Sequence, residues 1–156
     1  MQIIGASAVH LTPIGNEGGV DFYALIECDT GTHLFGSSAS GFRVVGQAKK
    51  YEQRQSITNF NSFLKVLDNV RHLHSSVVRC MPEWFRRGNG PILGLYVAHR
   101  GYQSGVPPVA AAHGVVLADS IDLGEMCALS NSLDASAAPD RRAHIFRSYV
   151  DQQLNN

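Results

Sequence analysis

Long apolar runs are absent from this sequence of 156 residues, and so is an excess of charge of either sign. No stretch reaches the roughly 18 apolar residues of a membrane-spanning helix, so we expect no membrane span. Thirteen basic and thirteen acidic residues cancel. The missing basic field counts against a high-affinity nucleic-acid binder, because phosphate contacts dominate such affinity. Local patches remain open, and Arg43, Lys49, Lys50 and Arg54 form one basic cluster.

Cysteine is scarce as well. Cys28, Cys80 and Cys127 are odd in number, widely spaced, and form no Cys-x-x-Cys pair. Neither a zinc knuckle nor a disulfide framework is therefore indicated, and reduced cysteines are typical of a cytoplasmic protein. The first residues lack the basic start and long apolar core of a signal peptide. We predict a cytoplasmic location.

The length suits one domain with a real core. Residues 1–130 hold the strongest patterns of apolar residues, and we assign them to the main body of the domain. Residues 131–156 are predicted to add a small-residue linker and a C-terminal helix, over 140–154, to the same domain. No internal repeat is visible.

Alternation and apolar runs predict the strands. Three antiparallel strands are expected to open the fold, and a nearly continuous apolar run over 92–98 indicates a central strand buried on both faces. In order, the predicted strands cover 2–11, 20–28, 42–49, 92–98 and 115–118.

Helical spacing and capping residues predict the helices between and after these strands. The segments concerned are 56–71, 82–87, 107–113 and 122–129, the last capped by Asp122. Strand–helix–strand order implies a crossover with parallel strands. The sequence therefore predicts an α/β fold with a mixed central sheet.

Polar side chains of one chemical kind gather at two predicted strands. Asp21 follows a Gly-Gly pair, and Gln47 and Lys49 alternate at the end of 42–49. Side chains two apart on a strand share one face. An aspartate and an amide oxygen can hold a hard cation, while a lysine steadies a water or the charge of a phosphate. This order is typical of metal-dependent nucleases, although each residue alone is also an ordinary turn or strand-end residue.

The two motifs are Gly18-Gly19-Val20-Asp21 and Val45-Gly46-Gln47-Ala48-Lys49-Lys50-Tyr51. Together they resemble the Mrr-like branch of the restriction-endonuclease-like superfamily, in which Gln-x-Lys replaces the commoner Glu-x-Lys. Downstream, residues 94–98 and 114–123 look like the last two core strands of that family and the helix that follows. The resemblance covers roughly residues 9–129.

The resemblance implies a restriction-endonuclease-like mixed central sheet flanked by helices. It implies a restriction or defence endonuclease that hydrolyses DNA phosphodiester bonds with Mg²⁺, or with Mn²⁺ as the alternative ion. Asp21, Gln47 and the backbone carbonyl of Ala48 would hold the metal, and Lys49 would act on the water or the phosphate. Weaker contacts to the nucleic acid are expected from Lys50, Tyr51, Arg54 and Arg100.

One departure from the family pattern concerns the beginning of the chain. The family carries a helix with a further acidic residue ahead of its first strand, whereas this sequence starts at or near the strand. Another region such as the predicted helix from Asp140, a second copy in a homodimer, or a partner subunit would then supply the missing helix, or the chain is part of a larger protein. Two other hypotheses remain open: an inactive nuclease-fold module that binds DNA or a protein partner, and an unrelated small α/β domain.

Overall fold

A computed structural model describes residues 5–13, 18–27, 41–129 and 144. Its centre is a five-stranded sheet in which the strands lie in chain order. The strands are β1 (Ala8–Leu11), β2 (Phe22–Glu27), β3 (Gly41–Lys49), β4 (Ile92–Ala98) and β5 (Val115–Ala118). β1, β2 and β3 pair antiparallel, whereas β3, β4 and β5 pair parallel. The predicted mixed sheet is confirmed, with β4 inside it.

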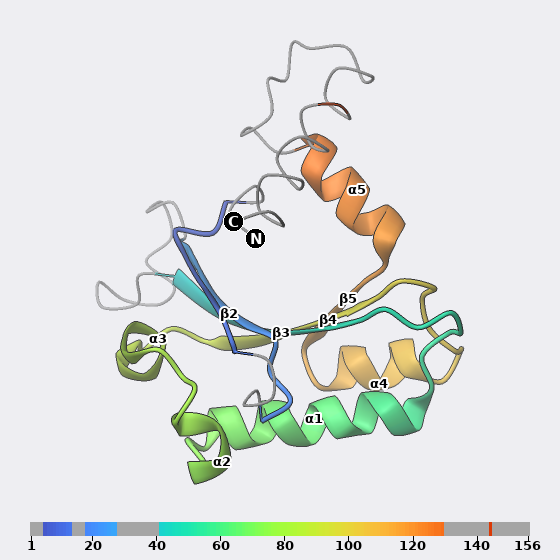
Figure 1. The fold of residues 1–156 in the computed structure, drawn as a ribbon. Helices are drawn as coiled ribbons and strands as arrows, with labels where there is room; N and C mark the ends of the chain where they lie inside the picture. Colours follow the sequence, from blue (N-terminus) through green and yellow to red (C-terminus); the bar gives the residue numbers. More distant parts are fainter. Residues whose placement is uncertain (1–4, 14–17, 28–40, 130–143, 145–156) are drawn as a thin grey trace.

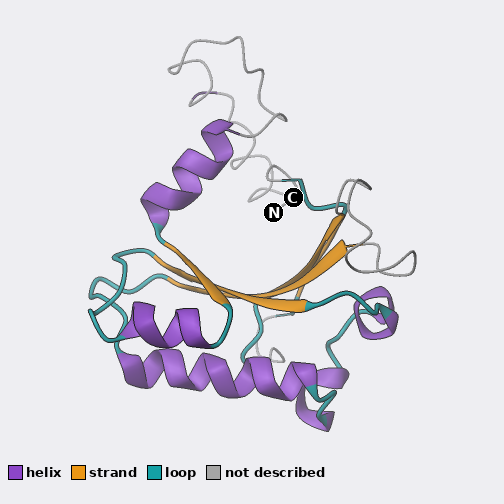
Figure 2. Ribbon diagram, turned by 180° about the vertical axis from the view of Figure 1, so that it is seen from behind, coloured by secondary structure: helices purple, strands orange, loops and turns teal. Residues whose placement is uncertain are grey.

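Helices cover both faces of the sheet. α1 (Ile57–Arg71) and α4 (Val106–Ala112) lie on one face, and α5 (Ser120–Leu129) lies on the other (Figure 1; Figure 2). α2 (Ser75–Val78) and α3 (Glu83–Arg87) are short helices between α1 and β4. None of these helices, in the part of the chain that the structure describes, has the length and apolar character needed to cross a bilayer. The predicted fold class, a mixed central sheet flanked by helices, is confirmed.

The larger part of the core lies between the sheet and α1. Ser56 caps the start of the helix, because its hydroxyl accepts a hydrogen bond from the Asn59 backbone N–H at 3.3 Å. Four apolar side chains then recur on one face and are buried: Phe60, Phe63, Leu67 and Val70. They pack with Tyr23, Val45 and Tyr96 from the three central strands. Residues two or four positions from Tyr23 on β2, or from Val45 on β3, therefore face α1 as well.

Element boundaries differ from the prediction at both ends of the chain. β1 begins at Ala8, and β2 begins at Phe22, so that Asp21 stands just outside the strand. Of the predicted C-terminal linker and helix, only His144 is among the described residues.

α5 is capped by a different aspartate from the one predicted. Asp119 Oδ1 accepts hydrogen bonds from the backbone N–H groups of Ile121, at 2.7 Å, and Asp122, at 3.0 Å. Asp122 Oδ2 accepts in return from the Asp119 N–H at 2.8 Å. The prediction of Asp122 as the cap was wrong, because Asp119 precedes the helix and Asp122 reaches back from its first turn.

Candidate metal and phosphate site at the end of strand β3

Asp21 lies just outside β2, beside the end of β3. β2 and β3 pair Tyr23 with Val45 and, as the last pair at this end, Phe22 with Gly46. Gln47 follows on β3 and alternates with Val45, so its side chain leaves the face that α1 covers. The structure therefore places these two predicted site residues at the same end of the β2–β3 pair.

The Asp21 carboxylate is tied to the backbone of β3. The Asp21 N–H donates to the Gly46 carbonyl at 2.9 Å, and Asp21 Oδ2 accepts from the Ala48 N–H at 2.6 Å. The side chain thus continues the hydrogen-bond ladder where β2 has not yet begun. Because N–H and C=O of one strand residue point to the same edge, the Ala48 carbonyl also lies on the edge that faces Asp21.

The Gln47 amide is buried and oriented by a turn. Its side chain is 7% exposed, and Nε2 donates to the Gly19 carbonyl at 2.7 Å. No donor among the described residues contacts Oε1, which leaves that oxygen as a free acceptor. Gly18 and Gly19 have φ angles of +52° and +86°, which glycine adopts readily. A Cβ on Gly19 would lie 2.6 Å from Val66 Cγ2, so the glycine pair is needed to present this carbonyl.

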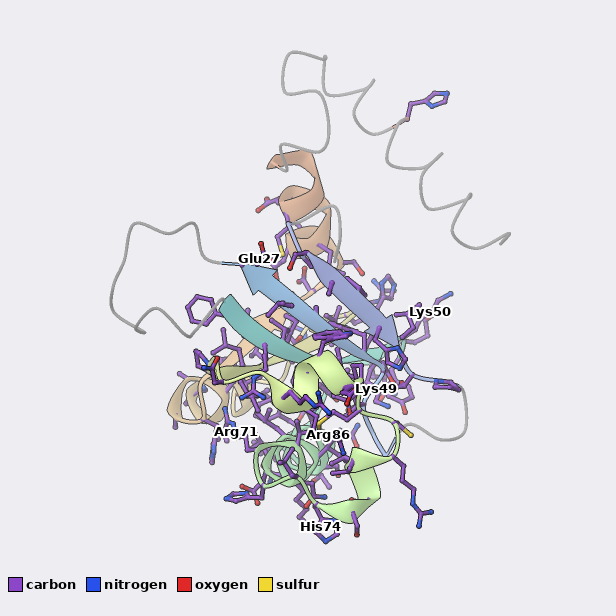
Figure 3. The ribbon with its side chains drawn as sticks, turned by 90° about the vertical axis from the view of Figure 1, so that its left-hand side faces the viewer. Glu27, Lys49, Lys50, Arg71, His74 and Arg86 are labelled. Carbon is purple, nitrogen blue, oxygen red and sulfur yellow. The ribbon has the colours of Figure 1, made fainter. Side chains whose placement is uncertain are left out.

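Lys49 is the last residue of β3 and is half-buried. Its carbonyl accepts from the His99 N–H at 3.1 Å, which holds the strand end against β4. By alternation its side chain leaves the same face as Gln47. Figure 3 labels Lys49 and Lys50 at one end of the sheet and Glu27 at the other. No ion pair within the described ranges involves Lys49, so its ammonium is available to a phosphate or a water.

Tyr96 adds a group that the sequence reasoning missed. It lies in register with Gln47 on β4, is fully buried, and donates its hydroxyl proton to Gln55 Oε1 at 3.2 Å. Burial, together with the charges of Tyr51 and Asp21, raises the pKa of Tyr96 to about 12. Tyr96 therefore stays neutral beside the Asp21 carboxylate. The pattern of 92–98 showed only a buried strand, and the register was needed to find this contact.

The predicted nucleic-acid contacts lie at the same end of the sheet. Lys50, Tyr51 and Arg54 are exposed directly after β3, and Arg100 is exposed just past the end of β4. The Arg100 guanidinium lies 3.7 Å from the Glu52 carboxylate. Because β3 and β4 are parallel, their carboxyl ends coincide.

Arg43 does not join this basic cluster. It stands near the start of β3, where its guanidinium donates to the carbonyls of Phe85, at 2.8 Å, and Gly90, at 2.9 Å. It also lies over the Phe85 ring, 5.4 Å from the ring centroid. Arg43 therefore fastens α3 and the loop after it to the sheet, at the end away from Lys49.

The donors at the end of β3 fit a hard cation. Asp21 supplies a carboxylate, and Gln47 and Ala48 each supply a neutral carbonyl oxygen. Such a sparse oxygen set suits Mg²⁺, which keeps several of its waters, and Mn²⁺ accepts the same donors. Within the described residues, no three His, Cys, Asp or Glu side chains gather as a metal-binding group. The chemistry of this site is thus that of one carboxylate, two neutral oxygens and one ammonium.

Comparisons with known proteins add one distant likeness. No protein-family model matches the chain, and no curated protein matches it with significance. Among solved structures, the chain is similar to the MspJI restriction endonuclease in complex with a 27-mer oligonucleotide, with 21% sequence identity and a TM-score of 0.45. The match covers 76% of this chain and 21% of that chain. Function therefore has to be inferred from the chemistry of the site.

Proposed function

We propose that the protein is a metal-dependent endonuclease that hydrolyses phosphodiester bonds of DNA at the end of β3. One observation carries this proposal: the Asp21 carboxylate is bound to the Ala48 N–H at the end of β3, between Gln47 and Lys49 in the chain, and the Gln47 amide is oriented by the Gly19 carbonyl. Lys49 follows on the same face one alternation later. The Gln-x-Lys resemblance to the Mrr-like branch supports the same conclusion and suggests a restriction or defence nuclease.

The site residues fix the oxygen donors before any ligand binds. The Ala48 N–H holds one carboxylate oxygen of Asp21, and the Gly19 carbonyl holds the nitrogen of the Gln47 amide. The other oxygen of each side chain, with the Ala48 carbonyl, would hold Mg²⁺. When bound, the ion lowers the pKa of a coordinated water and neutralises charge that develops on the phosphate. Preorientation of this kind avoids reorganisation at the moment of reaction.

Lys49 supplies the positive charge of the site. Its long, flexible side chain leaves the face of the sheet that carries Gln47. The ammonium at its end can therefore reach a phosphate or a water bound there. It would orient the attacking water or bind a non-bridging phosphate oxygen. Either interaction strengthens as the phosphate gains charge in the transition state, so it accelerates the chemical step more than it tightens substrate binding.

The surroundings fit a nucleic-acid backbone that passes across the end of the sheet. Lys50, Arg54 and Arg100 are exposed there and can neutralise phosphates. The balanced net charge of the chain means that few phosphates are contacted in total. We therefore expect moderate affinity with a shallow salt dependence.

Nicking of supercoiled plasmid tests this function. Wild-type protein, Asp21→Asn and Glu125→Gln are compared with Mg²⁺, with Mn²⁺ and with a chelator. Asp21→Asn keeps the shape and an acceptor for the Ala48 N–H but removes the charge. Glu125→Gln makes the same chemical change on the exposed surface of α5, on the opposite face of the sheet.

We expect metal-dependent nicking by wild type and Glu125→Gln, and a loss of about 10²-fold or more in Asp21→Asn. Wild-type protein that cuts no substrate would favour a binding module without catalysis. Undiminished cutting by Asp21→Asn would place the activity elsewhere.

A further inference from the structure

A polar pocket of about 290 Å³ opens beside the candidate site. It lies between the chain that leaves β3 and the first turn of α1. Amides supply four of its eight lining side chains, and one arginine and one glutamate balance in charge. The lining residues are Tyr51, Glu52, Gln53, Arg54, Gln55, Ser56, Asn59 and Gln103.

Gln55 is the buried polar group of this pocket, with 2% of its surface exposed. Its Oε1 accepts from the Tyr96 hydroxyl at 3.2 Å and from Asn59 Nδ2 at 3.3 Å. Its backbone is held on both sides, by the Gly101 carbonyl at 2.9 Å and the Gln103 N–H at 3.0 Å. The amide is thereby fixed with its NH₂ group as the remaining donor. Gln55 is a lining residue of the pocket, so this oriented donor is the group that it offers to a ligand.

The pocket lies at the same end of the sheet as the candidate metal and phosphate site. Tyr96, which donates to Gln55, is the β4 partner of Gln47. Tyr51, on the pocket wall, is two residues beyond Lys49. A group bound in the pocket would therefore lie near a phosphate held at Lys49.

We propose that this pocket binds one unpaired nucleobase adjacent to the scissile phosphate, which makes the substrate a DNA with a single-stranded or extruded nucleotide at the cut. This inference rests on the proposed nuclease function. The volume is at the lower end of small-ligand pockets, which suits one base and not a longer ligand. Amide side chains present the donors and acceptors that pair with base edges. Tyr51, 52% exposed, offers a face for stacking.

The charges of the pocket favour a base over a phosphate. Glu52 lies on the wall and would repel an anion, and its carboxylate lies 3.7 Å from the Arg100 guanidinium. Arg54 is the single cation of the lining. A neutral polar ring satisfies the Gln55 donor without burying uncompensated charge.

Nuclear magnetic resonance of the intact, ¹⁵N-labelled chain tests the proposal. In the presence of a chelator, the side-chain amide signals of Gln55 and Gln103 are followed during titration with each of the four 2′-deoxynucleoside 5′-monophosphates. Deoxyribose 5-phosphate, which lacks the base, is the control ligand. We expect these signals to shift with at least one nucleotide and not with the sugar phosphate. Equal shifts with both ligands, or no shift with any nucleotide, would overturn the proposal.

Substitutions at exposed residues of the pocket wall test nucleotide binding without disturbing the fold. Tyr51→Ala and Gln103→Ala should weaken binding of that nucleotide, by about tenfold for the stacking residue. Asn61→Ala, an exposed change on α1 outside the pocket, should leave the affinity unchanged. Equal affinity in all three variants would contradict the assignment.

The nuclease function and the base-binding pocket can be refuted separately. Nucleotide binding in the pocket without any plasmid cleavage would remove the nuclease proposal. Cleavage that depends on Asp21, with no pocket response to nucleotides, would remove the base site alone.

Discussion

Replacing Gln47 by Glu probes the metal site from within. In the wild type, Gln47 Nε2 lies 2.7 Å from the Gly19 carbonyl oxygen. The substitution puts an oxygen without a proton in that place, so that two acceptors face each other. The side chain is 7% exposed, which limits relief by water. The Asp21 carboxylate is bound to the backbone N–H of the next residue, Ala48, so the new carboxylate also meets a like charge.

These contacts set the size of the effect. Losing the hydrogen bond and leaving the Gly19 carbonyl unpaired costs about 1–3 kcal/mol, and a like charge on the neighbouring strand adds up to about 1 kcal/mol. The free energy of unfolding should therefore fall by roughly 2–4 kcal/mol without metal. For a chain of this length that lowers Tm by roughly 5–15 °C. A cation held by both carboxylates should restore about 2.7 kcal/mol at a hundredfold excess over its Kd.

Thermal unfolding followed by circular dichroism measures both effects, with chelator and with Mg²⁺ or Mn²⁺. Gln47→Leu is the matched control, because it removes the same hydrogen bond and adds no charge. We expect both variants to lose stability in chelator, and only Gln47→Glu to regain it with metal. An unchanged Tm in chelator, or an equal response of the two variants to metal, would refute the proposed site. Gln47→Glu should also retain cleavage with Mg²⁺ or Mn²⁺, since it restores the commoner acid of the superfamily that the sequence resembles.

Two further predictions concern Lys49 and the buried tyrosines. Lys49→Met should leave DNA affinity, measured by fluorescence anisotropy, within about twofold, and should slow single-turnover cleavage by about 10²–10³; a loss confined to affinity would contradict its proposed role. Tyr23→Phe should raise the free energy of unfolding in urea by about 1 kcal/mol, because the Tyr23 hydroxyl is buried with no hydrogen-bond partner among the described residues. Burial raises the pKa of Tyr23, and that of Tyr96, from 10.0 to about 12, and it also raises the pKa of Tyr102. The unfolded chain therefore loses these three protons first, and stability should fall between pH 10 and 12 by about 1.4 kcal/mol per pH unit for each tyrosine. In Tyr23→Phe that slope should be about two thirds as steep, and an identical slope would contradict this account.

The strand order could be predicted because its determinants are local. The apolar run over 92–98 demands cover on both faces, and α1 and α4 each stand between strands that the crossover rule makes parallel. These patterns can be recognised in the sequence without knowledge of long-range contacts. The mixed sheet and the place of β4 within it were confirmed for that reason.

The candidate site could be predicted only in part. Alternation already put Gln47 and Lys49 on one face, but the place of Asp21 depends on the β2–β3 register, which ends with Phe22 and Gly46. Asp21 therefore lies ahead of the strand, where its side chain accepts from the Ala48 N–H. The contact between Tyr96 and Gln55 joins residues 41 apart in the chain. Such a contact depends on how distant segments pack together, and no local sequence pattern predicts it.

The central claim is that Asp21, Gln47 and Ala48 form one cation site. Titration of the ¹⁵N-labelled chain with Mn²⁺ tests it most directly, because the paramagnetic ion broadens the signals of nearby groups. We predict selective broadening of the Gln47 side-chain amide and the Ala48 backbone N–H, with loss of this pattern in Asp21→Asn and its retention in Glu125→Gln. Broadening centred elsewhere in the chain, or an unchanged pattern in Asp21→Asn, would contradict the claim.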